Sequence, residues 1–186
     1  MCIKTKQDLK LYLNADIQNS IGKKNVFFEY IKGQYDVWLV YRFLVALRKM
    51  EYYSNNRKGM RKIFYLMYKH YFKRLQFKTQ FFISPNVFQE GLRIVHPGYI
   101  WITQSSRIGK NCTILPRVLL GKKKPGIPPP CVIIGDNCYI GTGSTILGPV
   151  KIGNNVTIAA GSVVIDDVPD NCMVAGNPAT IKKYKR

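Results

Sequence analysis

The sequence predicts an N-terminal α-helical subdomain followed by a parallel β-helix built from hexapeptide repeats. Residues 7–82 hold no proline and only three glycines, and apolar residues recur there at helical spacing. From residue 83 onward that spacing ends, all ten prolines appear, and a six-residue aliphatic period takes over. We therefore expect an α-helical subdomain over 1–82 and a β-helix domain with a C-terminal tail over 83–186.

Three helices are predicted in the first part of the chain. The apolar spacing places them near 7–20, 26–52 and 58–78. We expect interruptions at Gly33 and at 54–56, because glycine and consecutive Ser and Asn residues favour turns.

The second part follows a strict hexapeptide register. Every position of the register is Ile, Leu or Val: 102, 108, 114, 120, 134, 140, 146, 152, 158 and 164. Three hexapeptides make one triangular coil, so each aliphatic side chain should point inward and stack on the one a coil away. A loop over 122–133 interrupts the repeats. An all-β sandwich, the alternative, would show two-residue alternation and variable turn spacing.

Small residues and turn formers accompany the aliphatic register. Cys112 and Cys138 stand four positions after an aliphatic residue, where the corner is tight, so we interpret both as core residues. Asn or Gly stands where a turn needs a residue that tolerates positive φ, at positions 111, 137, 143, 155 and 161.

Composition argues against several classes of protein. With 186 residues, 46% hydrophobic and 21% charged, the chain is long enough for a core and is not wholly disordered. Its longest apolar stretch, residues 37–47, contains Arg42, whereas a membrane span needs about 20 apolar residues. The N-terminus has no apolar core typical of a secretory signal, so we expect a cytoplasmic protein. Five cysteines without a CxxC pair and two histidines give no zinc-site spacing, and no metal is expected.

The net charge of +19 is the strongest compositional signal. Residues 1–82 carry 17 Lys and Arg against 5 Asp and Glu, and residues 83–186 carry 12 against 5. Both parts are basic, which favours anionic partners: a polyphosphate cofactor, an anionic membrane surface or nucleic acid.

Several motifs resemble the serine acetyltransferase branch of the hexapeptide acyltransferases. They include NADIQ (14–18), YIKGQYDVWLVYR (30–42), GLRIVHPGYIWI (91–102), IGDNCYIGTGSTILGPVKIG (134–153) and VAGNPATI (174–181). The resemblance is strong over the β-helix and weaker over the helices. It implies a left-handed β-helix, a homotrimer with active sites between subunits, and an acyltransferase that uses acetyl-CoA as donor.

The resemblance also implies site residues. His96 matches the histidine that deprotonates the acceptor hydroxyl, a task that suits imidazole because it can accept a proton and then return it. His96 also falls in the aliphatic register, where an apolar residue would pack better, which favours the catalytic interpretation. Coenzyme A should lie along small residues and meet two lysines of the tail: Gly121, Thr142, Ala160, Lys182 and Lys183.

Departures from the family concern the acceptor. Val95 stands where serine acetyltransferases have an aspartate before the histidine, and Pro130 or Cys131 is nearest to their second histidine. The aspartate that orients the catalytic histidine falls near Phe82 and is absent; Glu90 is the nearest acid in sequence, but we expect it on a turn surface. These losses remove groups that would recognise a zwitterionic amino acid.

Three functions compete on these grounds. We expect an O-acetyltransferase acting on a sugar hydroxyl in capsular or exopolysaccharide biosynthesis, a role that the resemblance implies for short relatives. The alternative is a serine O-acetyltransferase of cysteine biosynthesis. The third, a basic module for nucleic acid, is disfavoured because a catalytic histidine has no place in it, and no nucleic-acid partner is expected.

The segment 57–78 carries a separate hypothesis. It holds eight Lys and Arg, no acidic residue and six Phe or Tyr. It suggests peripheral contact with the anionic inner face of a membrane. The alternative is that the aromatic residues form the interface between helices and β-helix while the lysines are solvated.

Overall fold

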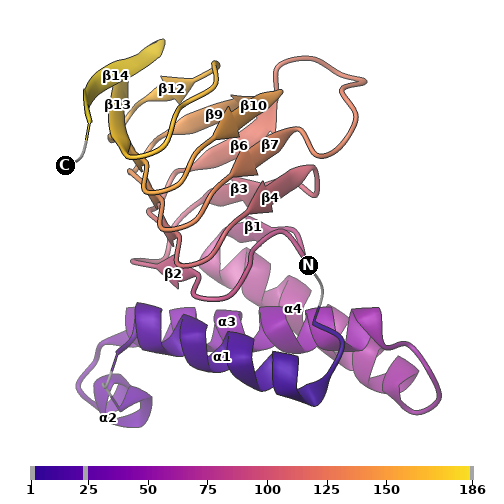
Figure 1. Cartoon of the computed structure of the whole chain (residues 1–186). Coiled ribbons are helices and arrows are strands. Elements are labelled where there is room, and N and C mark those ends of the chain that lie inside the picture. The colour runs from indigo at the N-terminus through magenta and orange to yellow at the C-terminus, as the bar shows by residue number, and fades with distance from the viewer. Residues whose placement is uncertain (1–2, 23–24, 185–186) are drawn as a thin grey trace.

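The fold is a helical layer packed across one end of a left-handed parallel β-helix (Figure 1). The computed structural model describes residues 3–22 and 25–184. Cys2, Lys23 and Lys24 lie outside these ranges. The coils rise from the helical layer, and the C-terminal strands lie at the far end (Figure 1).

The helical prediction is confirmed, with one interruption inside the second helix. The helices are α1 (Lys6–Ser20), α2 (Val26–Ile31), α3 (Tyr35–Asn55) and α4 (Arg61–Thr79). Gly33 separates α2 from α3 with φ of 80°, a backbone conformation that glycine adopts without strain. Thr5 begins α1 through a capping box, because its hydroxyl accepts from the Asp8 amide at 3.0 Å while the Asp8 carboxylate accepts from the Thr5 amide at 2.8 Å.

Three sheets form the sides of the β-helix. The first contains β1 (Phe81–Ile83), β3 (Ile100–Ile102), β6 (Leu119–Lys122), β9 (Thr145–Gly148) and β12 (Val163–Val164). The second contains β4 (Ser106–Ile108), β7 (Val132–Ile134) and β10 (Val150–Ile152). The third contains β2 (Arg93–Ile94), β5 (Thr113–Ile114), β8 (Tyr139–Ile140), β11 (Thr157–Ile158), β13 (Cys172–Gly176) and β14 (Ala179–Tyr184).

The register of the strands matches the predicted coil. Thr157 pairs with Tyr139, one regular coil earlier, whereas Tyr139 pairs with Thr113 across a longer stretch of chain, because the loop between β6 and β7 lies between them. All five predicted turn positions have positive φ: Asn111, Asn137, Gly143, Asn155 and Gly161. The inward aliphatic residues are buried, and Cys112 and Cys138 are buried with them, as predicted.

One hydrophobic core joins the two layers. Phe43 of α3 packs edge-on against Phe81 of β1, with ring centroids 4.9 Å apart, and against Phe72 of α4 at 5.5 Å. The expected boundary after residue 82 falls inside β1, which pairs with β3 of the β-helix. The first coil therefore depends on the helices for its apolar cover.

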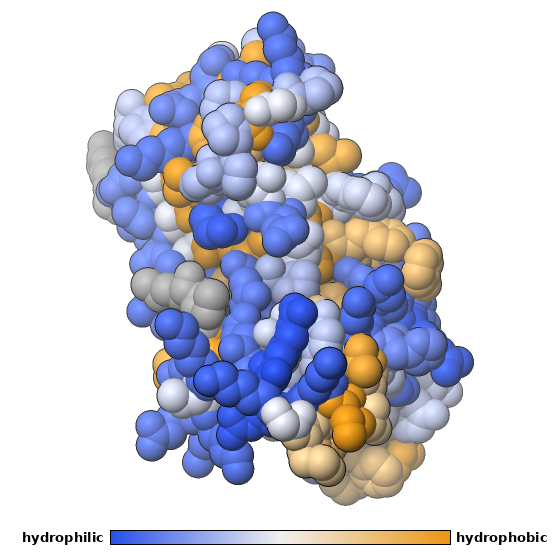
Figure 2. Space-filling view, turned by 90° about the vertical axis from the view of Figure 1, so that its right-hand side faces the viewer, coloured by the Kyte–Doolittle hydropathy of each residue, from blue (hydrophilic) through white to orange (hydrophobic). Residues whose placement is uncertain are grey.

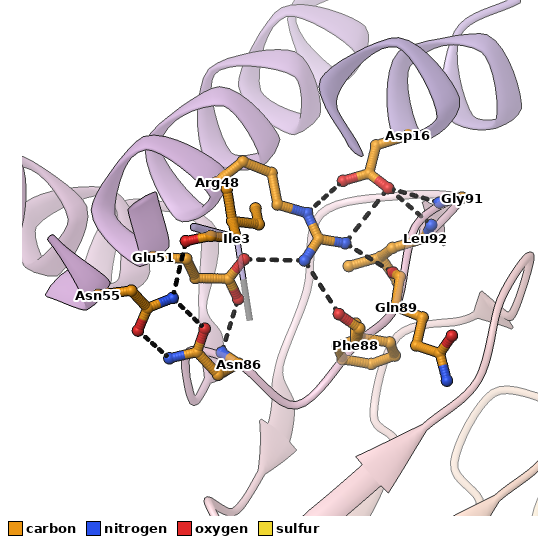
Figure 3. Close-up of polar contacts among 10 residues, drawn as sticks. All are labelled: Ile3, Asp16, Arg48, Glu51, Asn55, Asn86, Phe88, Gln89, Gly91 and Leu92. Carbon is orange, nitrogen blue, oxygen red and sulfur yellow. Dashed lines mark hydrogen bonds and ion pairs between the residues drawn. The ribbon is translucent and has the colours of Figure 1, made fainter. Parts of the chain in front are cut away.

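A buried polar cluster fixes the helices to the first coil (Figure 3). Arg48 of α3 is fully buried, and each of its five N–H groups has an acceptor. The guanidinium donates to Asp16 of α1 at 2.6 and 3.3 Å, to Glu51 at 2.9 Å, and to the carbonyl oxygens of Phe88 at 3.1 Å and Gln89 at 2.8 Å.

The same carboxylates hold the chain that leads into the first coil. Asp16 accepts from the amides of Gly91 at 2.8 Å and Leu92 at 2.9 Å, and Glu51 accepts from the amide of Asn86 at 2.7 Å. Burial raises the pKa of both carboxyls, against the opposing attraction of Arg48. The cluster thus fixes residues 86–92, the segment immediately before the candidate site.

Candidate active site

His96 lies at a widened corner of the first coil. Ile94 pairs with Ile114, and Ile102 pairs with Leu120. The chain between Ile94 and Ile114 is two residues longer than the chain between Ile102 and Leu120. The two extra residues lie in the corner between β2 and β3. They carry the His96 side chain outward, and 67% of it is exposed.

The prediction that His96 occupies the inward register was wrong. Ile94 fills that place and is 1% exposed. The extra corner residues shift the register of the first coil relative to the regular six-residue period. The outward position is the one that a general base needs, since the imidazole must reach a substrate.

A cleft of about 570 Å³ opens beside His96. Three segments line it: the C-terminal end of α1 with Ser20, the junction of α2 and α3 over residues 33–37, and the first coil with Arg93, Val95 and His96. The helical layer and the β-helix thus contribute opposite walls.

Asp36 is the residue that sequence reasoning missed. It lies in the first turn of α3, and its Oδ2 is 3.8 Å from His96 Nδ1. Glu90, the nearest acid to His96 in sequence, instead pairs with Lys110 at 2.9 Å, and its side chain is 17% exposed. The only sequence signal was an acid shortly after the helix break at Gly33.

Hydrogen bonds from α1 hold the wall that carries His96. Asn19 Nδ2 donates to the Gly91 carbonyl oxygen at 2.7 Å, and the Ser20 hydroxyl donates to the Leu92 carbonyl oxygen at 3.0 Å. Together with Asp16, which holds the amides of both residues, these contacts fix the backbone on either side of Leu92. The following strand, β2, therefore leaves the helical layer in a defined direction.

The candidate donor residues fall into two groups. Thr142 and Ala160 lie at the same corner as His96, in turns that stack on one another. The Thr142 hydroxyl donates to the Pro116 carbonyl oxygen of the coil before it at 2.7 Å. The Gly161 amide of the coil after it donates to the Thr142 carbonyl oxygen at 2.8 Å. Both side chains are small and exposed. Gly121 lies further along the coil, in β6.

The other group is the C-terminal pair of lysines. Lys182 and Lys183 are exposed on β14, which pairs antiparallel with β13 at the end of the β-helix far from the helices (Figure 1). The structure brings His96, Thr142 and Ala160 to one corner and leaves the two lysines at the end of a neighbouring sheet.

The loop between β6 and β7 begins with three lysines, and two of them fold back onto the chain. Lys122 Nζ donates to the Ile127 carbonyl oxygen at 2.5 Å, and Lys123 Nζ donates to that of Ile165. Across residues 3–22 and 25–184, no group of three or more His, Cys, Asp or Glu side chains is arranged to hold a metal ion.

Known proteins share both the sequence pattern and the fold. The family model "Bacterial transferase hexapeptide (six repeats)" matches residues 131–166. "Serine acetyltransferase 4" of Arabidopsis thaliana is 42% identical over 94 residues, which are 50% of this chain and 26% of that protein. The chain spans between a quarter and two fifths of the first curated relatives, at 26% and 38% of their lengths.

Two solved structures extend the similarity to the helical layer. Serine acetyltransferase from Brucella abortus strain S19, in complex with coenzyme A, is 25% identical with a TM-score of 0.68. The match covers 97% of this chain and 68% of the Brucella chain. Soybean serine acetyltransferase complexed with serine is 27% identical with a TM-score of 0.69, over 95% and 70% of the two chains. The similarity thus includes the helices that form one wall of the cleft.

Proposed function

We propose that this chain, a serine acetyltransferase-like member of the hexapeptide-repeat proteins, transfers an acetyl group from acetyl-CoA to a hydroxyl. The observation that carries the proposal is the pair of His96 and Asp36 at the mouth of the cleft. An exposed imidazole with a carboxylate beside one ring nitrogen is the arrangement of a general base and its positioning group.

The chemistry follows from the two ring nitrogens of His96. Asp36 faces Nδ1, which leaves Nε2 for the acceptor. Nε2 accepts the hydroxyl proton as the acceptor oxygen attacks the thioester carbonyl carbon. When the tetrahedral intermediate collapses, the C–S bond breaks, the acetyl ester forms, and the proton passes from Nε2 to the departing thiolate. Asp36 stabilises the imidazolium that exists between these steps.

The donor is expected to lie along the corner beyond His96. The coenzyme A complex of the Brucella relative supports this donor. Thr142 and Ala160, whose side chains are small and exposed, suit an extended pantetheine arm, with Gly121 further along the coil, and the cations Lys182 and Lys183 suit the phosphates.

A homotrimer would complete the site. The side chains of His96 and Asp36 are 67% and 63% exposed, so the cleft of one chain alone is open to water. A neighbouring β-helix against this corner would exclude water and bring a second wall to the donor. Sedimentation that finds a fully active monomer would overturn this part of the proposal.

Serine is the leading acceptor. The relatives named above are serine acetyltransferases. The cleft also supplies charges that were not evident from the sequence: Arg93 suits the carboxylate of an amino acid, and Asp36 Oδ1 suits its ammonium group. The two charged side chains come from opposite walls, so a small zwitterion would bridge them.

A sugar hydroxyl is the second candidate. Val95 favours it, because an apolar residue beside His96 removes one anionic contact to an ammonium group and suits the face of a sugar ring. The two acceptors separate in one assay, which follows free thiol released from acetyl-CoA.

The assay compares L-serine with a panel of monosaccharides and nucleotide sugars. We expect saturable release with L-serine, and Arg93→Gln should raise KM for serine more than it lowers kcat. Saturation with a saccharide and none with serine would promote the second candidate. If no acceptor raises release above acetyl-CoA hydrolysis, the proposed acetyl transfer is wrong.

A further inference from the structure

We propose that the outer face of α4 and the turn before it, residues 57–74, binds the surface of an anionic membrane. The proposal is independent of acetyl transfer. It rests on two properties of this face: its exposed apolar side chains and its uncompensated cations.

The apolar side chains lie outside the core. Met60, Ile63, Leu66 and Met67 are 70, 54, 56 and 60% exposed. Positions 60, 63 and 67 follow helical spacing and share one face, which begins before the first turn of α4. Figure 2 shows apolar side chains gathered in the lower part of the molecule and bordered by hydrophilic ones.

The aromatic residues of the segment have a different role from the one that the membrane hypothesis gave them. Phe72 is buried, and Tyr65, Tyr68 and Tyr71 pack against the hydrophobic core. The alternative interpretation is therefore correct for these rings, which join α4 to the rest of the fold. Two other aromatic residues of the segment, Phe64 and Phe77, are 41 and 67% exposed, so the exposed apolar surface combines aliphatic, thioether and some aromatic side chains.

The cations of this face have no carboxylate partners. Seven of them are exposed: Arg57, Lys58, Arg61, Lys62, Lys69, Lys73 and Arg74. Within residues 3–22 and 25–184, no ion pair includes a residue of this segment. Some of the cations stack on tyrosine rings, as Arg57 does on Tyr65 at 4.2 Å, which holds the charge at the surface without neutralising it.

The face begins at the end of the helical layer opposite the cleft and runs back along α4, where Tyr71 accepts a hydrogen bond from Arg42 of α3 at 2.7 Å. α3 runs from Tyr35, next to Asp36, to Asn55, and a helix of 21 residues is about 30 Å long. The turn after α3 leads directly into the proposed face (Figure 1). No helix in the described parts of the chain combines the length and apolar content of a membrane span.

The chemistry favours lipid over the other anionic or apolar partners. A symmetric contact with a second copy would oppose two faces of the same positive charge. Nucleic acid would neutralise the cations but would leave Met60, Ile63 and Met67 without an apolar partner. An anionic bilayer satisfies both, because its headgroups attract the cations while its acyl boundary receives the apolar side chains.

Flotation of the whole protein with phosphatidylcholine vesicles, with and without phosphatidylglycerol, tests the proposal. We expect binding only with phosphatidylglycerol, and less of it at high salt. Replacing Lys58, Lys62 and Lys73 by Gln should weaken partitioning into the vesicles about a hundredfold. Each lysine near an anionic surface contributes about 1 kcal/mol of binding free energy, and about 1.4 kcal/mol corresponds to a tenfold change. The matched control replaces Lys110, Lys124 and Lys151, which are exposed on the β-helix, and should bind like the wild type.

A second variant separates lipid from other polyanions. Met60→Ser with Ile63→Ser and Met67→Ser keeps every cation and should also weaken partitioning at least tenfold. Wild-type binding by this variant, displacement from vesicles by duplex DNA, or equal loss in the lysine control would each overturn the proposal. The absence of wild-type binding at low salt would also overturn it. So would sedimentation showing that the triple-serine variant has changed its oligomeric state, if that change explains its weaker binding.

Discussion

Replacing Arg48 by Met tests how the helical layer holds the first coil. The substitution keeps an unbranched apolar stem and removes five hydrogen bonds at a fully buried position. Asp16 would keep its two backbone amides and Glu51 would keep one, but both carboxylates would lose their cation.

The expected loss of stability is large. Removing one partner of a buried ion pair costs about 3–5 kcal/mol, because the remaining charge stays buried without compensation. For a chain of this size, that corresponds to a fall in melting temperature of roughly 6–20 °C. Arg42→Met is the matched control on the same helix, since Arg42 donates to the Tyr71 hydroxyl at 2.7 Å in a partly buried contact. It should cost about 1 kcal/mol.

The loss should depend on pH in a defined direction. The ordinary pKa values of Asp16 and Glu51 are 3.8 and 4.5, and burial already raises the pKa of both in the folded protein. Without Arg48 these folded-state values rise further. A carboxyl with a raised folded-state pKa stabilises the fold below its unfolded pKa and loses that contribution as the pH rises through the folded value. The deficit of Arg48→Met should therefore be smaller near about pH 5 than near about pH 8.

Thermal unfolding followed by circular dichroism, at matched protein concentration and several pH values, measures both effects. A deficit equal to that of Arg42→Met would refute the argument from buried charge. A deficit of the expected size that does not change with pH would show that lost hydrogen bonds to Phe88 and Gln89, and not the carboxylates, account for it.

Three further substitutions test the site and the coil. His96→Ala should lower kcat about a hundredfold or more while calorimetry finds unchanged binding of acetyl-CoA, and near-normal turnover would assign the base to another group. Asp36→Asn keeps shape and removes charge, so kcat should fall about tenfold, less than for His96→Ala, with a shifted pH–rate profile; an unchanged profile would argue against a positioning role. A Cβ on Gly148 would overlap the Cys131 carbonyl oxygen, so Gly148→Ala should destabilise the fold by about 1–3 kcal/mol in chemical unfolding, and unchanged stability would mean that the loop relaxes freely.

The coil was predictable because it is local and repeated. Each aliphatic position meets the same environment one coil away, so the period in sequence is the period in space. Asn137 and Asn155 occupy equivalent turns with φ of 56°, which their side chains tolerate. The helices were predictable for the same reason, since their apolar spacing is local.

The site was predictable only in part, because it joins segments far apart in the chain. Asp36 lies in the helical layer and His96 on the first coil, and nothing near either residue in the sequence points to the other. The extra residues at the His96 corner were not evident from the sequence. Ile94 and Ile100 are six residues apart, as are His96 and Ile102, so the period alone does not decide which pair points inward. Asp16 and Arg48 are polar residues in helices and suggest solvent exposure; only their mutual contact explains why both are buried.

The helical layer also has a consequence for solubility. A stack of parallel coils presents unpaired backbone groups and an apolar cross-section at each end, and more coils, or more molecules, could add there indefinitely. At one end β14 turns back antiparallel on β13, so that end of the sheet no longer offers a parallel template. At the other end α3 and α4 cover β1 with Phe43 and Phe72. The helices therefore act as a terminator of the solenoid, and a β-helix released from them would be expected to assemble end to end.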